Sequence, residues 1–118
     1  MADSGLFIGF GLPVRGRERQ AIKVFNEVFE YYTRLQQEGE IESFEPVLLE
    51  PHGGDLGGFF LLRGDQDKLD RIRSSAEFER QIARGQLSVE RIGIVGAALG
   101  GRLASQMSMF TEQLEELL

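Results

Sequence analysis

His52 is the side chain best suited to acid–base chemistry, because it is the only histidine in a chain that has no cysteine. It lies in the run Glu50-Pro51-His52-Gly53-Gly54-Asp55, where Glu50 or Asp55 could orient the ring and the glycines would let a ligand approach. A histidine positioned in this way can act as a general base. The alternative is a polar loop residue exposed between two strands. We therefore predict His52 as the only candidate catalytic residue.

A metal site would have to combine His52 with carboxylates such as Glu45, Glu50 and Asp55. This spacing matches no metal-ligand signature, and the lack of cysteine excludes thiolate sites and disulfides. We predict neither a metal nor a cofactor.

Three aromatic side chains could line a site for an apolar or aromatic small molecule: Phe7, Tyr32 and Phe60. Tyr31 and Tyr32 are adjacent in a helical segment, so one of them should point inward with its hydroxyl near a pocket. Packing in the core is the alternative role for each of these rings.

Two glycine-rich stretches fall short of nucleotide-binding motifs. Gly9-x-Gly11 follows an apolar run, but the third glycine of the dinucleotide fingerprint is misplaced and Pro13 follows. The stretch Gly96-x-x-x-Gly100-Gly101-Arg102 lacks the Lys-Ser/Thr ending of a phosphate loop. It could offer N–H groups to an anion at the start of the last helix, or serve as a hinge before it.

The first half of the chain alternates between strand and helix patterns. The apolar run 6–12 predicts a strand with Leu6 and Ile8 on one face and Phe7 on the other. An apolar stripe at three- and four-residue steps then predicts a helix of about six turns that Gly39 ends. The segment 41–50 is typical of a strand, and Pro46 within it favours an edge position.

The second half repeats this order. A glycine-rich connection leads to the apolar strand 59–63, and Asp65 or Asp67 begins a short helix. The capping-box pattern Ser74-x-x-Glu77 restarts that helix. A fourth strand is predicted over 89–98, and the stripe Leu99, Leu103, Met107, Phe110, Leu114 and Leu117 predicts a last helix over 99–118.

The order of elements predicts an α+β fold of the ferredoxin-like β-α-β-β-α-β type, with a four-stranded antiparallel sheet and an extra C-terminal helix. Both main helices should lie on one face of the sheet. The other face, which holds Phe7 and Val95, would leave a large apolar patch in a monomer. We expect a homodimer through this face, with the last helix extending the contact.

Composition bounds the remaining possibilities. The chain has 118 residues, so we expect a single domain over 1–118, with a core of about 6–98 and a C-terminal helix of about 99–118. The formal net charge of −6 and the scattered basic residues argue against nucleic acid as a partner. No apolar segment is long enough for a membrane span or a secretory signal, so we expect a soluble cytoplasmic protein.

The pattern Leu69-x-x-Ile72-Arg73-x-Ser75-x-x-Phe78, together with the opening strand and the hairpin, resembles the dimeric α/β-barrel superfamily over roughly residues 6–98. Within that superfamily the chain is most similar to uncharacterised bacterial proteins. The resemblance implies a sheet-to-sheet homodimer with a cavity between each sheet and its helices, or between the two sheets. It implies cofactor-independent oxygenation of quinol-like molecules, haem breakdown, isomerisation or lactone chemistry, or ligand sensing. The haem-degrading branch uses a helical histidine, whereas His52 lies in a loop.

Two functions therefore stay open. The first is a homodimeric protein that binds a small molecule or has a regulatory role, without a catalytic motif. The second is an enzyme of the cofactor-independent monooxygenase or isomerase kind, with His52 as its base. An enclosed cavity within reach of His52 would favour the second.

Overall fold

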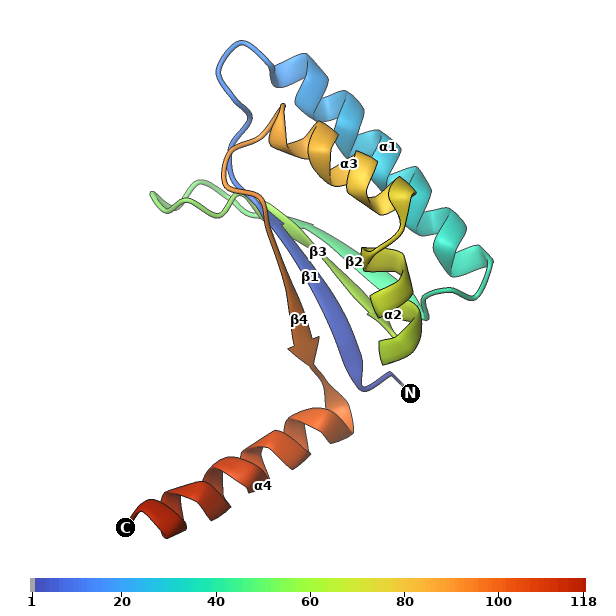
Figure 1. The fold of residues 1–118 in the computed structure, drawn as a ribbon. Coiled ribbons are helices and arrows are strands. Elements are labelled where there is room, and N and C mark those ends of the chain that lie inside the picture. Colours follow the sequence, from blue (N-terminus) through green and yellow to red (C-terminus); the bar gives the residue numbers. More distant parts are fainter. Residues whose placement is uncertain (1) are drawn as a thin grey trace.

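The computed structural model describes residues 2–118 of the chain. Its strands are β1 (Ser4–Phe10), β2 (Ser43–Leu48), β3 (Gly58–Gly64) and β4 (Gly93–Ala98). Its helices are α1 (Glu18–Gln37), α2 (Gln66–Arg73), α3 (Ala76–Gln86) and α4 (Gly100–Leu117). α1, α2 and α3 lie on one side of the sheet, whereas α4 stands away from it (Figure 1).

The four strands form one antiparallel sheet in the order β2-β3-β1-β4. This order and the element sequence confirm the predicted α+β, ferredoxin-like fold. Both crossovers place their helices on the same face because β-α-β connections are right-handed.

The core lies between this helix-covered face and the helices. Leu6 and Ile8 of β1 and Phe60 and Leu62 of β3 are all buried there. They meet the inward stripe of the helices, in which Tyr32, Leu69 and Phe78 are among the buried side chains. The alternation predicted for the first strand is therefore confirmed.

Local signals set the helix ends. The left-handed backbone of Gly39 (φ 76°) lets its N–H reach the carbonyl of Gln36, so α1 ends where predicted. Asp65 caps α2 by accepting from the N–H of Lys68. The capping residue of α3 was predicted wrongly: Ser75 accepts from the N–H of Phe78, whereas Ser74 ends α2.

β2 is an edge strand, as Pro46 predicted. The N–H of Leu49 donates to the carbonyl of Gly57 at 2.9 Å, and ladder bonds alternate along an antiparallel pair. Pro46 lies opposite Phe60, in a pair that makes no ladder hydrogen bonds, whereas the neighbouring pair Val47–Phe59 does. The proline nitrogen therefore faces away from β3. The missing N–H therefore costs the ladder nothing.

β4 is the other edge strand, and it begins four residues later than predicted. Arg91 adopts a left-handed backbone (φ 56°) that interrupts the ladder between Glu90 and Gly93. At this edge the Arg73 guanidinium donates to the carbonyl of Ile94 at 3.2 Å.

α4 leaves the sheet at the end of β4 and is held there by the N-terminal segment. The carbonyl of Asp3 accepts from the N–H of Leu99, and its carboxylate accepts from the N–H of Gly101 at 3.1 Å. Arg102 donates to the hydroxyl of Ser4 and to the side-chain oxygen of Gln66. The start of α4 is thus capped by a carboxylate of the chain itself.

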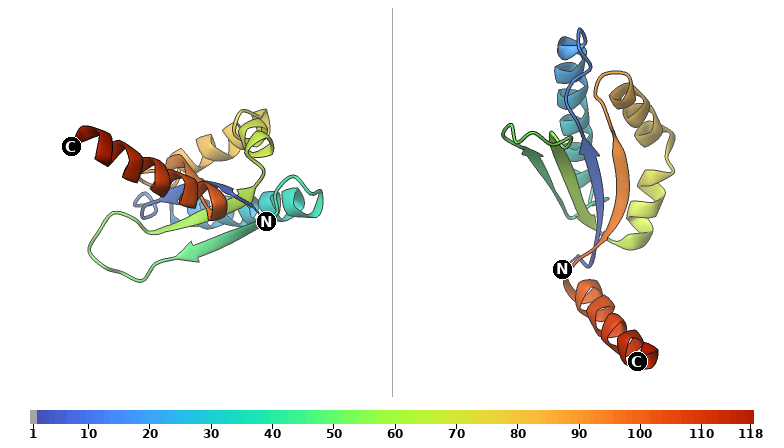
Figure 2. Two further views of the ribbon diagram at one scale, coloured as in Figure 1. Left: turned by 90° about the horizontal axis from the view of Figure 1, so that it is seen from below. Right: turned by 90° about the vertical axis from the view of Figure 1, so that its left-hand side faces the viewer.

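No residue of α4, which the structure describes in full, is buried. The right-hand view of Figure 2 shows this helix clear of the other elements. Within residues 2–118 no helix is both long and apolar enough to cross a membrane.

Candidate ligand cavity

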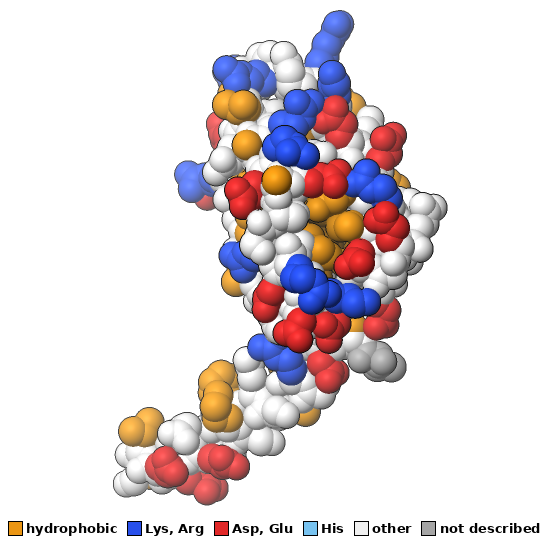
Figure 3. Space-filling view, turned by 45° about the vertical axis from the view of Figure 1, so that its right-hand side comes forward, with side chains coloured by type: hydrophobic (Ala, Val, Ile, Leu, Met, Phe, Trp, Pro, Cys, Tyr) orange, Lys and Arg blue, Asp and Glu red, His pale blue; other side chains and the backbone are white. Residues whose placement is uncertain are grey.

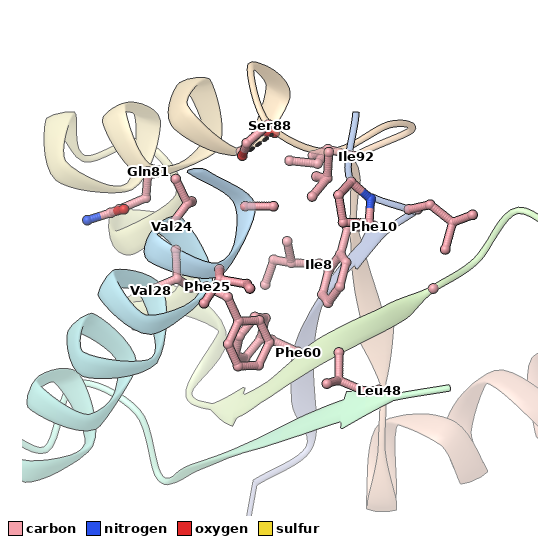
Figure 4. Close-up of a pocket in the computed structure, with 18 of the residues that line it drawn as sticks. Ile8, Phe10, Val24, Phe25, Val28, Leu48, Phe60, Gln81, Ser88 and Ile92 are labelled. Carbon is pink, nitrogen blue, oxygen red and sulfur yellow. Dashed lines mark hydrogen bonds between the residues drawn. The ribbon is translucent and has the colours of Figure 1, made fainter. Parts of the chain in front are cut away.

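A cavity of about 490 Å³ opens between the helix-covered face of the sheet and helices α1 and α3 (Figure 4). This volume falls within the range of about 300–1,000 Å³ that is usual for small-molecule sites. Its lining on α1 runs from Ala21 to Tyr32 and comes mostly from the first half of the helix.

Aromatic rings form the floor of the cavity. Phe60 lies at their centre, with its ring centroid 5.1 Å from that of Phe25, 5.1 Å from that of Tyr32 and 6.1 Å from that of Phe10. Phe10 and Phe25 meet edge to face at 6.3 Å. These rings come from β1, β3 and α1, because the strand alternation and the helix stripe aim them at the same layer.

The polar groups along the wall are few. Among the described residues that line the cavity, none carries a charge, and the side-chain polar groups belong to Tyr32, Gln81 and Ser88. The hydroxyl of Ser88 donates to the carbonyl of Arg84 at 2.9 Å. Burial raises the pKa of Tyr32, so its hydroxyl keeps its proton.

Gln81 differs from Ser88 in its hydrogen bonding. Its Oε1 is buried and has no hydrogen-bond partner within residues 2–118. The side chain lies on α3 opposite Val24 and Val28 of α1 (Figure 4). A buried acceptor without a partner costs about 1–3 kcal/mol, so a ligand that donates to it would recover that free energy.

The mouth of the cavity is apolar as well. Leu12, Ile22 and Leu48 line the cavity and are 65%, 63% and 68% exposed. They come from the loop after β1, from α1 and from the end of β2. We refer to these three side chains as the rim.

The predicted site residues fall into three places. Tyr32 and Phe60 line the cavity together. Phe7 lies on the opposite face of the sheet, where its ring centroid is 5.0 Å from that of Phe59. His52 lies in the loop between β2 and β3 and is exposed.

The ring of His52 is bonded to its own loop. Its Nε2 lies 2.7 Å from the carbonyl oxygen of Leu56, and its Nδ1 accepts from the N–H of Gly54 at 3.2 Å. His52 is not among the residues that line the cavity. A role as general base would require this loop to rearrange.

Sequence reasoning missed Phe10, Phe25 and Gln81 as cavity residues. Phe10 shares strand parity with Leu6 and Ile8, and Phe25 lies at the spacing of the helix stripe, so the sequence pattern does not separate either of them from a core residue. Gln81 comes just before the inward Ile82, and a polar residue at the margin of an apolar stripe was its only signal.

The opposite face of the sheet is a second apolar surface. We define the open face by the apolar side chains that the strand register places there, namely Phe7, Val47, Phe59, Leu61 and Val95. The register places Glu45 and Arg63 on the same face, where they form an ion pair at 3.0 Å. Leu99 lies over one end of this face, because a side chain at Gly5 would come within 3.1 Å of its Cδ1.

No protein-family model matches the sequence, and no curated protein matches it. Solved structures match its fold. A dabb family protein with a ferredoxin-like fold from Mesorhizobium loti is 13% identical, with a TM-score of 0.66 over 86% of this chain and 100% of the other. A dimeric ferredoxin-like protein of unknown function from Bacteroides fragilis is 14% identical, with a TM-score of 0.62 over 81% of this chain and 95% of the other.

The fold is also similar to that of SnoaB, a cofactor-independent oxygenase from Streptomyces nogalater. The two chains are 15% identical, with a TM-score of 0.55 over 84% of this chain and 95% of SnoaB. At these identities the comparisons establish the fold. They confirm the predicted ferredoxin-like fold.

Proposed function

We propose that this protein is a homodimer that binds an apolar small molecule in the cavity between its sheet and helices α1 and α3, and that it acts by binding rather than by catalysis. The observation that carries this proposal is the cavity wall, which is apolar apart from the side-chain groups of Tyr32, Gln81 and Ser88. Such a wall suits a hydrophobic ligand that needs little charge recognition.

The ligand we propose carries a hydrogen-bond donor at one end, such as a hydroxyl group. The aromatic floor around Phe60 would hold its rings, and the unpartnered Oε1 of Gln81 would accept from the donor. The ligand would not need the hydroxyl of Ser88, which would keep its hydrogen bond to the carbonyl of Arg84.

The open face supports the dimer. Val95 is 56% exposed in the single chain and pairs with Phe7, so an apolar surface runs from β4 into β1. An exposed apolar patch of this kind on a sheet usually marks a protein interface. Some proteins of similar fold are described as dimeric.

A fluorescence titration with N-phenyl-1-naphthylamine tests the ligand site. We expect saturable binding of one dye per chain that Val24→Phe abolishes, because Val24 lines the cavity and the larger ring would fill it. Val14→Phe is the matched control, since Val14 does not line the cavity. Unchanged dye binding in a folded Val24→Phe variant would contradict the proposal.

A cofactor-independent oxygenase is the second candidate function, favoured by the similar fold of SnoaB. It would need His52 to reach the cavity as a base. Dioxygen uptake with an aromatic quinol, lost in His52→Ala, would support it. No uptake by the unaltered protein would leave binding as the function.

We also propose a cytoplasmic location in a bacterial cell, as the composition and the resemblance led us to expect. Fractionation of cells that produce the protein without added tags tests this.

A further inference from the structure

We propose that α4 of one protomer closes the mouth of the cavity in its partner, so that each ligand site is completed in trans. The inference rests on the proposed dimer and ligand site. It assigns a partner surface to α4 and a cover to the rim, neither of which the single chain supplies.

α4 carries an apolar stripe that nothing in its own chain covers. Leu103, Met107, Phe110 and Leu114 lie at helical spacing and are 50–59% exposed. The bonds of Asp3 and Arg102 hold the start of the helix against β1 and α2. α4 is therefore a positioned arm rather than a frayed terminus.

The direction of this arm suits a partner that lies on the open face. α4 starts at the end of the sheet far from the cavity mouth and runs off on the side away from α1 and α3 (Figure 1). Eighteen helical residues span about 27 Å. Packed sheets lie about 10 Å apart, so the arm could pass the end of a partner's sheet and reach its helices.

A two-fold dimer of open faces can form in two ways. If the axis runs along the strands, like ends meet and the two α4 helices lie side by side. If the axis runs across the strands, α4 of each copy meets the mouth end of the other. In the second case the arm crosses the gap between sheet and helices, which is where the cavity opens.

Charge favours the second arrangement. Beyond Arg102, α4 has three carboxylates and no basic residue, namely Glu112, Glu115 and Glu116. Side-by-side helices would bring these like charges together. Residues 15–23, which lead into α1 beside the rim, hold Arg15, Arg17, Arg19 and Lys23 against the single acid Glu18. Figure 3 shows several basic side chains at that end of the molecule and acidic ones at the far end of α4.

Apolar surface favours the same arrangement. The rim and the α4 stripe are both exposed in the single chain. Placing the stripe over the rim of the partner would remove both from water at once, and would also shut the ligand site.

Cross-linking distinguishes the two arrangements, because the chain has no cysteine of its own. The double variant Ile22→Cys/Leu114→Cys, treated with a short bismaleimide at micromolar concentration, should give a covalent dimer on a denaturing gel. Leu114→Cys alone should give none. The control pair Asn26→Cys/Leu114→Cys keeps the α4 cysteine and moves the other one turn along α1, to a residue that does not line the cavity.

A covalent dimer from Leu114→Cys alone, or none from the Ile22 pair while light scattering shows a dimer, would overturn the inference. A monomer by light scattering would refute the proposed dimer itself, and the inference with it. Dye binding gives a second measurement: Leu114→Ser should weaken N-phenyl-1-naphthylamine binding about fivefold and Gln113→Ser should leave it unchanged. Equal affinity in both variants would also overturn it.

Discussion

Replacing Val95 by lysine should separate the protomers without unfolding them. Val95 lies on β4 with 56% of its surface exposed in the single chain, opposite Phe7 in the register. In the monomer the lysine would reach water, so the free energy of unfolding should change by about 0.5 kcal/mol or less. In the dimer it would place an ammonium group between two apolar faces.

The loss of dimerisation free energy can be calculated from the exposed area of Val95. Dimerisation would remove roughly 80 Å² of Val95 surface from water in each copy, worth about 2 kcal/mol per side chain at 25 cal/mol per Å². A two-fold interface contains the contact twice, so the expected loss is about 4 kcal/mol, or about a thousandfold in the dimer dissociation constant.

Sedimentation velocity over a range of micromolar concentrations measures this change, with circular dichroism to confirm folding. Asn26→Lys is the matched control, since it adds the same charge to the exposed surface of α1. A folded Val95→Lys variant that dimerises as tightly as the control would show that the open face is not the interface.

Three further substitutions test other parts of the structure. Gln81→Leu should raise the free energy of unfolding by about 1 kcal/mol or more in urea titrations, because it removes a buried acceptor without a partner, and should reduce the preference for hydroxylated ligands over their deoxy analogues. Ser75→Ala should lower thermal stability by about 1 kcal/mol through loss of the α3 cap, whereas Ser74→Ala should cost less than half of that; equal losses would contradict the assignment of the cap. Burial raises the pKa of Tyr32, so its stabilising effect is complete below about pH 10 and is lost above it, by about 1.4 kcal/mol per pH unit; urea titrations at pH 9 and 11 should show a larger loss in the unaltered protein than in Tyr32→Phe, which keeps the loss due to Tyr31, whose pKa burial also raises.

The elements of the fold were predictable because each has a local cause. Strand parity separated Leu6 and Ile8 from Phe7, and Pro46 indicated the edge strand. The predicted element boundaries were wrong where the backbone conformation does not follow from the residue type. Arg91 adopts a left-handed conformation without being glycine, and adjacent serines compete for one capping position, which Ser75 takes.

The site was less predictable, since it depends on distances between layers rather than on pattern. The same apolar pattern is expected whether a helix packs tightly on the sheet or leaves a cavity beneath it. The pattern therefore could not distinguish Phe10 and Phe25 from core residues. Tyr32 and Phe60 do share the cavity. The direction of α4 depends on contacts with Asp3, Ser4 and Gln66, which are distant from it in the sequence. His52 bonds within its own loop, and no motif indicates that its ring stays there.

Both edges of the sheet are unsuited to strand addition, which constrains how these molecules can aggregate. On β2 the nitrogen of Pro46 faces outward and has no hydrogen to donate. On β4 the outward carbonyl of Ile94 already accepts from Arg73. An incoming strand would lose a ladder bond on either side, so this sheet resists growth into open-ended fibrils. Association is thereby directed to closed assemblies built through its faces.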